Sequence, residues 1–126
     1  MGLDTTHGCW HGPYSQFMRW RIHLHRLIHI GQDMPAEFDD DREWLYAAWD
    51  SGEYNDQSVP INVLMNHSDC DGSISTEDCG PLADALEALL ALMPERGIYD
   101  EMRPATERFI AGLRLAAAEG EDVEFH

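Results

Sequence analysis

The sequence predicts a small α/β or α+β fold in which about four helices pack on a three-stranded sheet. In four segments, apolar residues recur at the three- and four-residue spacing of amphipathic helices. Three short segments instead alternate, or are rich in branched side chains, as strands are. The order is strand, two helices, strand, two helices, strand, which packs as helices on a single sheet. With 126 residues and 44% hydrophobic composition, residues 1–126 form one domain.

Start and stop signals bound the predicted helices. Pro13 suits the first position of a helix, and Gly31 is a natural stop for it. Pro94 and Gly120 end two later helices in a similar way. The predicted helices cover residues 13–30, about 36–50, a third from a cap at Ser75 or Thr76 to Pro94, and a fourth from Pro104 to Gly120.

The predicted strands cover residues 3–7, 60–66 and 122–126. The first and last alternate, and the middle one is a short apolar run typical of a buried strand. Histidine ends or directly follows each of them, as His7, His67 and His126. If the strands run parallel, these three histidines lie at one edge of the sheet, where open α/β sheets place ligands. The sequence therefore predicts a site at this edge.

The charge of the chain restricts its function. The net charge is −16, and all eight basic residues are arginine. Without lysine, Walker-A nucleotide hydrolysis and Schiff-base chemistry are excluded. The acidic field repels phosphates, which disfavours direct nucleic-acid binding and leaves a basic host protein as a possible partner. No apolar run approaches the roughly 20 residues of a membrane helix, and no signal-peptide pattern is found, so we expect a cytoplasmic protein without membrane contact.

Residues 67–78 have the composition of a metal-ion loop. Asp69 and Asp71 alternate before Gly72, an arrangement that can wrap a cation. In the register of a calcium-binding EF-hand, however, position 1 is His67, where calcium prefers an oxygen ligand. Position 12 is Asp78, where calcium prefers the longer Glu. The mixture of imidazole, carboxylate and thiol groups favours zinc, manganese or iron over calcium as the divalent metal cofactor.

The other predicted strand ends are expected to complete this site. Cys9 and His11 flank Trp10 in a glycine-bounded turn, and an odd number of cysteines in a reducing compartment favours metal ligation or burial over disulfides. The predicted metal ligands are His67, Asp69, Asp71, Asp78, His7, Cys9, His11 and His126. The site is thus a composite of three segments of the chain.

Three further histidines lie along the first predicted helix. Of His23, His25 and His29, only the last two share a face at i, i+4 spacing. The glutamate of a metalloprotease motif is missing between them. We therefore assign these histidines to the surface or to packing.

The loop resembles motifs of two enzyme families. Residues 69–74 resemble the nucleophile motif of haloacid-dehalogenase-like phosphatases, which implies a nucleophilic Asp69 and an acid/base Asp71. Residues 67–72 are similar to the first motif of the DHH phosphoesterases, in which His and Asp side chains hold manganese. The chain has neither the lysine usual in the first family nor the Asp-His-His triad of the second.

A broader resemblance spans nearly the whole chain. Residues 1–12, residues 64–72 with 77–81, and the closing Glu124-Phe125-His126 resemble an uncharacterised family of short phage and prophage proteins. The resemblance implies a viral or mobile-element origin, and hence the host cytoplasm. It supplies no activity.

Three functions remain open. The leading hypothesis is a small soluble metal-binding protein with a composite His/Asp/Cys site at the strand ends. The second is a metal-dependent phosphoesterase or nuclease, with Glu77 or Asp78 as general base. The third is an interaction or anti-defence protein that blocks a host factor through its acidic surface or sequesters a small nucleotide. Arg19, Arg21 and Arg26, with the aromatic residues of 44–54, would supply charge and stacking for the nucleotide.

Overall fold

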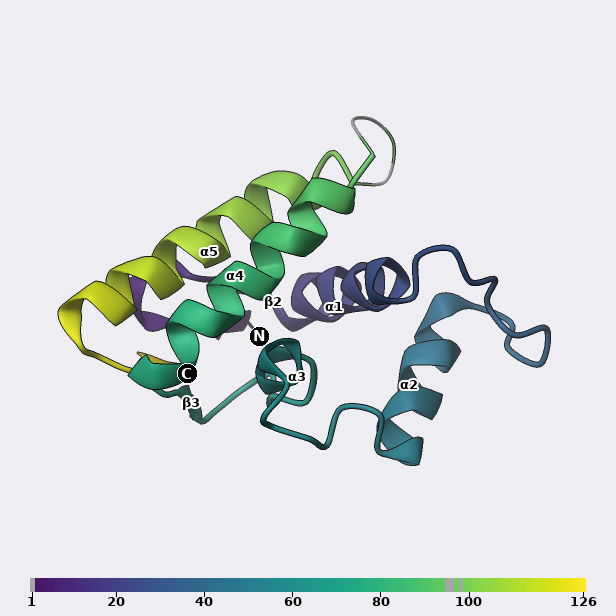
Figure 1. The fold of residues 1–126 in the computed structure, drawn as a ribbon, viewed down its shortest axis with the longest axis horizontal. Coiled ribbons are helices and arrows are strands. Elements are labelled where there is room, and N and C mark those ends of the chain that lie inside the picture. The colour runs from purple at the N-terminus through teal and green to yellow at the C-terminus, as the bar shows by residue number, and fades with distance from the viewer. Residues whose placement is uncertain (1, 95–96, 98) are drawn as a thin grey trace.

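The computed structural model describes residues 2–94, 97 and 99–126. This part of the chain has an α+β fold with five α-helices and four short strands. Figure 1 shows α4 and α5 side by side, α1 and α3 next to them, and α2 at the far end of the molecule. The elements are β1 (Gly2–Asp4), the 3-10 helix η1 (Thr6–Gly8), β2 (His11–Pro13), α1 (Tyr14–Ile28), α2 (Asp41–Ser51), α3 (Pro60–Met65), β3 (Ser73–Ile74), α4 (Thr76–Leu92), α5 (Met102–Glu119) and β4 (Val123–Glu124).

An aromatic cluster in the core joins α1, α5 and the turn before β2. Trp20 stacks on Trp10 with ring centroids 5.1 Å apart and contacts Phe109 of α5 at 4.9 Å. The Trp20 indole Nε1 donates a 2.9 Å hydrogen bond to Thr106 Oγ1, so the ring is buried with its polar group satisfied. Phe17 meets the edge of Trp10 at 5.2 Å. These contacts fix α1 against α5.

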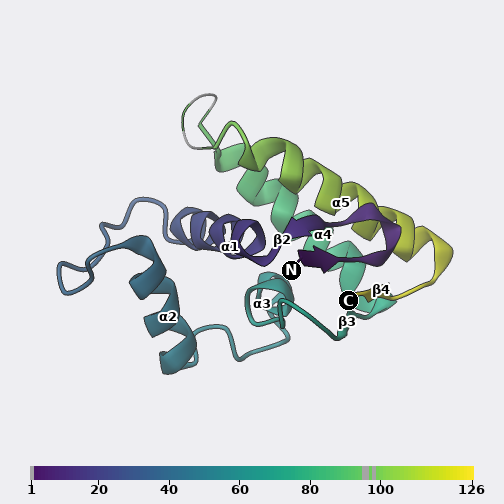
Figure 2. The same cartoon turned by 180° about the vertical axis from the view of Figure 1, so that it is seen from behind.

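The two ends of the chain lie next to each other. β1 and β2 form an antiparallel hairpin in which Leu3 pairs with Gly12, and β3 pairs with β4. Asp4 and His126 exchange two backbone hydrogen bonds, of 2.9 and 2.8 Å, and Phe125 N donates to Gly72 O at 2.9 Å. The last residues therefore lie between the N-terminal hairpin and the loop before β3, as Figure 2 shows from behind.

The four predicted helices are present, at slightly different bounds. α1, α4 and α5 match the predicted segments, and Gly120 ends α5 in the left-handed conformation at φ 66°. α2 begins later than predicted, at Asp41, because the Asp40 carboxylate accepts a 2.9 Å hydrogen bond from Glu43 N and caps the helix there. In the part of the chain that the structure describes, every helix falls short of the length and apolar character needed to cross a bilayer.

The predicted three-stranded sheet is wrong. Residues 60–65 form the fifth helix, α3, instead of a strand. A short apolar run does not distinguish a buried strand from a buried helix, and here Pro60 starts the helix while the Asn62 side chain donates to Asp56 O at 2.9 Å. The remaining strands form two antiparallel pairs. His7, His67 and His126 are therefore not aligned at the edge of one parallel sheet.

Candidate metal centre

Two histidines of α1 and one glutamate after α2 form a cluster. His25 and His29 lie one helical turn apart, with ring centroids 4.6 Å from each other. Trp44 of α2 packs on both rings, at 4.7 and 5.3 Å. Gly52 ends α2 in the left-handed conformation at φ 81°, and Glu53 N then donates back to Ala48 O. This turn brings the Glu53 carboxylate to the two histidines.

The ligand atoms of this cluster are spaced as a metal site requires. Glu53 Oε2 lies 3.0 Å from His29 Nε2 and 3.7 Å from His25 Nδ1. All three ligand atoms lie within 4.8 Å of one another. Ligand atoms bound at about 2.0–2.1 Å in a tetrahedral site are about 3.4 Å apart. The distance from Glu53 to His29 is shorter than this and the distance from Glu53 to His25 is longer, so a small rearrangement of the side chains would enclose an ion.

Burial keeps His25 neutral. Its side chain is fully buried, and this burial, with the neighbouring His29, lowers its pKa to about 4 although Glu53 opposes the shift. Burial and the charge of Glu53 raise the pKa of Tyr54, so the phenol keeps its proton, and its hydroxyl forms a hydrogen bond with His25 Nδ1. His25 Nε2 is buried and has no hydrogen-bond partner among the described residues. A neutral imidazole is the form that binds metals.

Two imidazoles and one carboxylate are an established ligand set for transition metals. Zinc in hydrolytic sites takes two His and one Glu and keeps a fourth position open, and a 2-His-1-carboxylate set holds iron(II) in oxygenases. Tyr54 lies beside this set, because its hydroxyl already contacts His25 Nδ1. A metal at Nδ1 would have to displace this hydroxyl.

A second cluster contains one of the predicted ligands, His7. His7 Nε2 lies 3.0 Å from Glu121 Oε1 and 3.6 Å from Glu119 Oε2, and its Nδ1 lies 2.8 Å from Thr6 Oγ1. The backbone of His7 is left-handed, with φ 61°. Both glutamates are about half exposed, so this cluster is open to water, unlike the one at His25.

His67 is held by the backbone around it. Its Nδ1 lies 2.8 Å from Ser68 O and its Nε2 lies 3.1 Å from Ser73 O, while its ring packs at a tilt against Phe125 with centroids 4.1 Å apart. The buried Arg21 donates a 2.7 Å hydrogen bond to His67 O. Both ring nitrogens thus already contact carbonyl oxygens.

His11 and His126 flank a different carboxylate, Asp4. His11 Nδ1 lies 3.4 Å from Asp4 Oδ1, and His126 Nε2 lies 3.8 Å from Asp4 Oδ2. The side chains of His11 and His126 are 88% and 63% exposed. The structure therefore brings together two predicted ligands that are distant in the sequence, but in open solvent and around a residue that was not predicted.

The remaining predicted ligands are dispersed. Cys9 is buried, and burial raises the pKa of its thiol to about 12, so it is not a thiolate at neutral pH. Asp78 Oδ2 accepts a 3.0 Å hydrogen bond from Ser75 Oγ at the start of α4. Asp69 lies in a shallow depression with His67 and Arg21, and Asp71 is exposed. Within the described residues, His7 is the one predicted ligand that belongs to a group of three side chains whose ligand atoms lie close enough together to hold a metal ion.

Glu53, Tyr54 and the α1 histidines were not among the candidate ligands predicted from the sequence, and the assignment of these histidines to the surface or to packing agrees with the aromatic contacts of His25 and His29. The spacing of His25 and His29 was the available signal, because such a pair offers two ligands from one helix face. The carboxylate lies 24 residues beyond His29 and reaches it through the packing of α2 on α1. Comparison of the chain with family models, with curated proteins and with solved structures found no match.

Proposed function

We propose that the protein binds a divalent transition-metal ion, with zinc as the first choice, at His25, His29 and Glu53. The observation that carries this proposal is the convergence of two imidazole nitrogens and one carboxylate oxygen within 4.8 Å, with His25 buried and neutral. Zinc suits this set because it accepts His and Glu ligands at tetrahedral spacing. Manganese is second, since it prefers more oxygen ligands.

The composite site of residues 67–78 is the competing location for the metal. It would require His67 to give up its contacts with two carbonyl oxygens, and Cys9 to ionise while buried. In the α1 cluster, one contact with an outside group has to be given up, that of His25 Nδ1 with the Tyr54 hydroxyl, and the contact to be reorganised at His29 is with another ligand of the same set. This difference favours the α1 cluster.

Matched glutamine variants test the location. Zinc binding is measured by calorimetry on metal-free protein, together with the zinc content after dialysis. Changing an outer-shell partner of a metal ligand costs 10–100-fold in affinity, so loss of a ligand in His29→Gln or Glu53→Gln is expected to cost more than about 100-fold. His23→Gln, on the same helix but outside the cluster, is the control and keeps the affinity of the parent protein. Full zinc binding by Glu53→Gln, or loss in His67→Gln alone, overturns the proposal.

Metal-dependent hydrolysis of a phosphate ester is a second candidate function. The observation that favours it is the number of ligands: three protein groups leave a position at which zinc or manganese could bind and activate water. His29 also lines a cavity of about 210 Å³ together with Ile30 and Tyr99, where a substrate could lie next to the metal. A phosphodiester assay with added metal tests it, and equal rates for the parent protein and Glu53→Gln count against it.

We also propose a phage or prophage origin, which rests on the resemblance of three sequence segments. The structure adds one supporting observation. The N-terminal segment, the loop at Gly72 and the tail at Phe125, which carry the resemblance, lie against one another through backbone hydrogen bonds. Detection of the open reading frame within an integrated phage genome would test the origin.

A further inference from the structure

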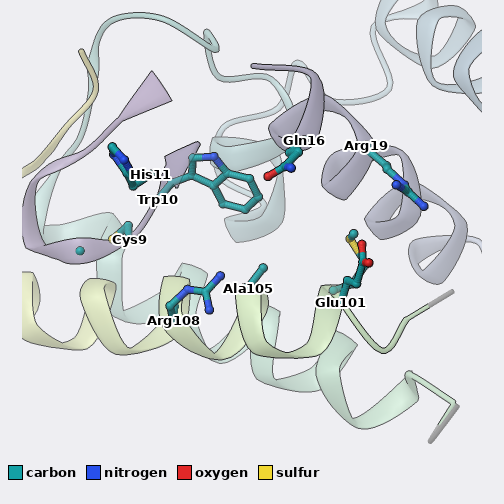
Figure 3. Close-up of a pocket in the computed structure, with 10 residues that line it drawn as sticks. Cys9, Trp10, His11, Gln16, Arg19, Glu101, Ala105 and Arg108 are labelled. Carbon is teal, nitrogen blue, oxygen red and sulfur yellow. The ribbon is translucent and has the colours of Figure 1, made fainter. Parts of the chain in front are cut away.

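A cavity of about 310 Å³ lies between α1, the first turn of α5 and the turn before β2. It is separate from the cluster at His25, with which it shares no residue. Figure 3 shows the side chains around it. The buried side chains that line it are Cys9, Trp10, Met102 and Ala105, and the exposed ones are His11, Gln16, Arg19, Glu101 and Arg108. An apolar floor with a few polar groups at its rim is typical of sites for small molecules.

The arginines of this rim are unusual within the molecule. Arg26 and Arg114 form ion pairs, and Arg21 and Arg103 donate to backbone carbonyls. Arg19, Arg42 and Arg108 make neither kind of contact with a described residue, and two of these three line the cavity. In a chain of net charge −16, two guanidinium groups at one cavity that pair with no carboxylate of the described residues indicate a site for an anion.

The floor of the cavity is apolar and includes the Trp10 indole, which is buried. In Figure 3 the indole lies between His11 and Gln16, above Arg108 and Ala105. A buried aromatic ring beside Met102 and Ala105 favours a ligand with a flat apolar part.

The two ends of the cavity differ in charge. Figure 3 shows Arg108 and His11 toward one end, next to Trp10, and Glu101 with Arg19 toward the other. Asp4 Oδ1 lies 3.4 Å from His11 Nδ1, and Asp4 does not line the cavity. A ligand that carries only negative charge would meet Glu101 unfavourably. A ligand with an anionic group at one end and hydrogen-bond donors at the other fits both.

We propose that this cavity binds a nucleoside monophosphate. The phosphate contacts Arg108. Glu101 accepts hydrogen bonds from the ribose or base, and Gln16 donates them. The base packs over the apolar floor at Trp10 and Ala105. Arg19 adds positive charge at the rim. This is not the nucleotide site expected from the sequence, in which Arg21 and Arg26 would supply charge beside the aromatic residues of 44–54. Those two arginines are engaged elsewhere, because Arg21 is buried and donates to backbone carbonyls and Arg26 is paired with Asp41.

Calorimetric titration with AMP, GMP, CMP and UMP tests the proposal. It is carried out in EDTA, so that the result does not depend on the metal centre. At least one nucleotide is expected to bind with Kd below about 1 mM, and adenosine and inorganic phosphate, as the separate halves of AMP, are each expected to bind at least about tenfold more weakly. No detectable binding of any of the four nucleotides overturns the proposal. Phosphate binding as tight as that of the nucleotides also overturns it, because the site would then be an anion site only.

Variants locate the ligand. Arg108→Gln is expected to weaken nucleotide binding at least about tenfold, because a charge-assisted hydrogen bond to phosphate is lost. Arg42→Gln removes the same charge outside the cavity and is expected to change the affinity by less than about twofold. Ala105→Leu fills the floor without changing the charge and is expected to abolish binding while the protein stays folded, as judged by its melting temperature. Equal effects of Arg108→Gln and Arg42→Gln overturn the assignment to this cavity.

Discussion

His25 and His67 differ in what surrounds their ring nitrogens. The His67 nitrogens both contact backbone carbonyls of their own loop, within six residues, and the ring serves to pack Phe125. The His25 ring instead meets side chains from α2 and from the turn after it, Trp44, Glu53 and Tyr54. A histidine held by carbonyls stabilises a loop, whereas one held by a carboxylate and a hydroxyl can exchange these partners for a metal.

The largest effect is expected where the tail packs against the loop. Phe125→Ala removes a buried ring that contacts Phe17 and His67, and it is expected to lower the free energy of unfolding by about 3–5 kcal/mol. Urea unfolding measures this loss, and Leu115→Ala, at an exposed position, is the control. Zinc affinity is expected to stay within about twofold of that of the parent protein. A large loss of zinc affinity would mean that the tail belongs to the metal site.

The next effect concerns the pH dependence of stability in metal-free protein. The pKa of His25 is about 4 when folded and 6.5 as a free side chain, so the unfolded chain binds more protons between these values. Stability is therefore lost as pH falls from 6.5 to 4, by about 3 kcal/mol in total. Unfolding curves at pH 7, 5.5 and 4 should show this component in the parent protein. It should be missing from His25→Gln, and equal slopes for the two proteins would contradict the prediction.

A smaller effect is expected from the phenol beside His25. Tyr54→Phe leaves His25 Nδ1 without its hydrogen-bond partner, which is expected to cost about 1–3 kcal/mol in metal-free protein. Saturating zinc should reduce this difference, because the ion takes the position of the lost hydroxyl at Nδ1. Thermal melts with and without zinc measure both quantities, with the exposed Tyr46→Phe as the control. If zinc leaves the difference unchanged, Nδ1 is not a ligand.

The smallest effects are expected at the exposed histidines. His11→Ala and His126→Ala remove side chains whose pairing with Asp4 takes place in water, and each is expected to change the free energy of unfolding by less than about 0.5 kcal/mol. Neither should change the zinc content of the purified protein. A loss of bound zinc in either variant would favour the composite site of residues 67–78 over the cluster at His25, His29 and Glu53.

Much of the helical structure could be predicted because its signals are local. Pro13, Gly31 and Gly120 act within one turn of the helix that they bound, so the positions of α1 and α5 follow from neighbouring residues. Residues 60–66 could not be assigned in this way, because a short apolar run of this length shows neither the two-residue nor the 3.6-residue period. Its helical state depends on Pro60 and on the contact of Asn62 with Asp56.

The candidate metal centre could be predicted only in part. The spacing of His25 and His29 is a local property of one helix, and the sequence shows it. The third ligand is not local: Glu53 reaches the pair because Trp44 packs α2 on α1 and Gly52 reverses the chain. The histidines at the ends of the predicted strands were favoured by a parallel sheet that does not form, since residues 60–65 are helical.

The backbone pairing of Asp4 with His126 makes the path of the chain almost circular. A short peptide could join the two ends, and new termini could be placed between Gly31 and Asp40, in the connection from α1 to α2. Such a circular permutant would begin with α2 and Glu53 and finish with His25 and His29. The proposed ion would then bridge the first and last helices of the new chain, which Trp44 already packs against each other.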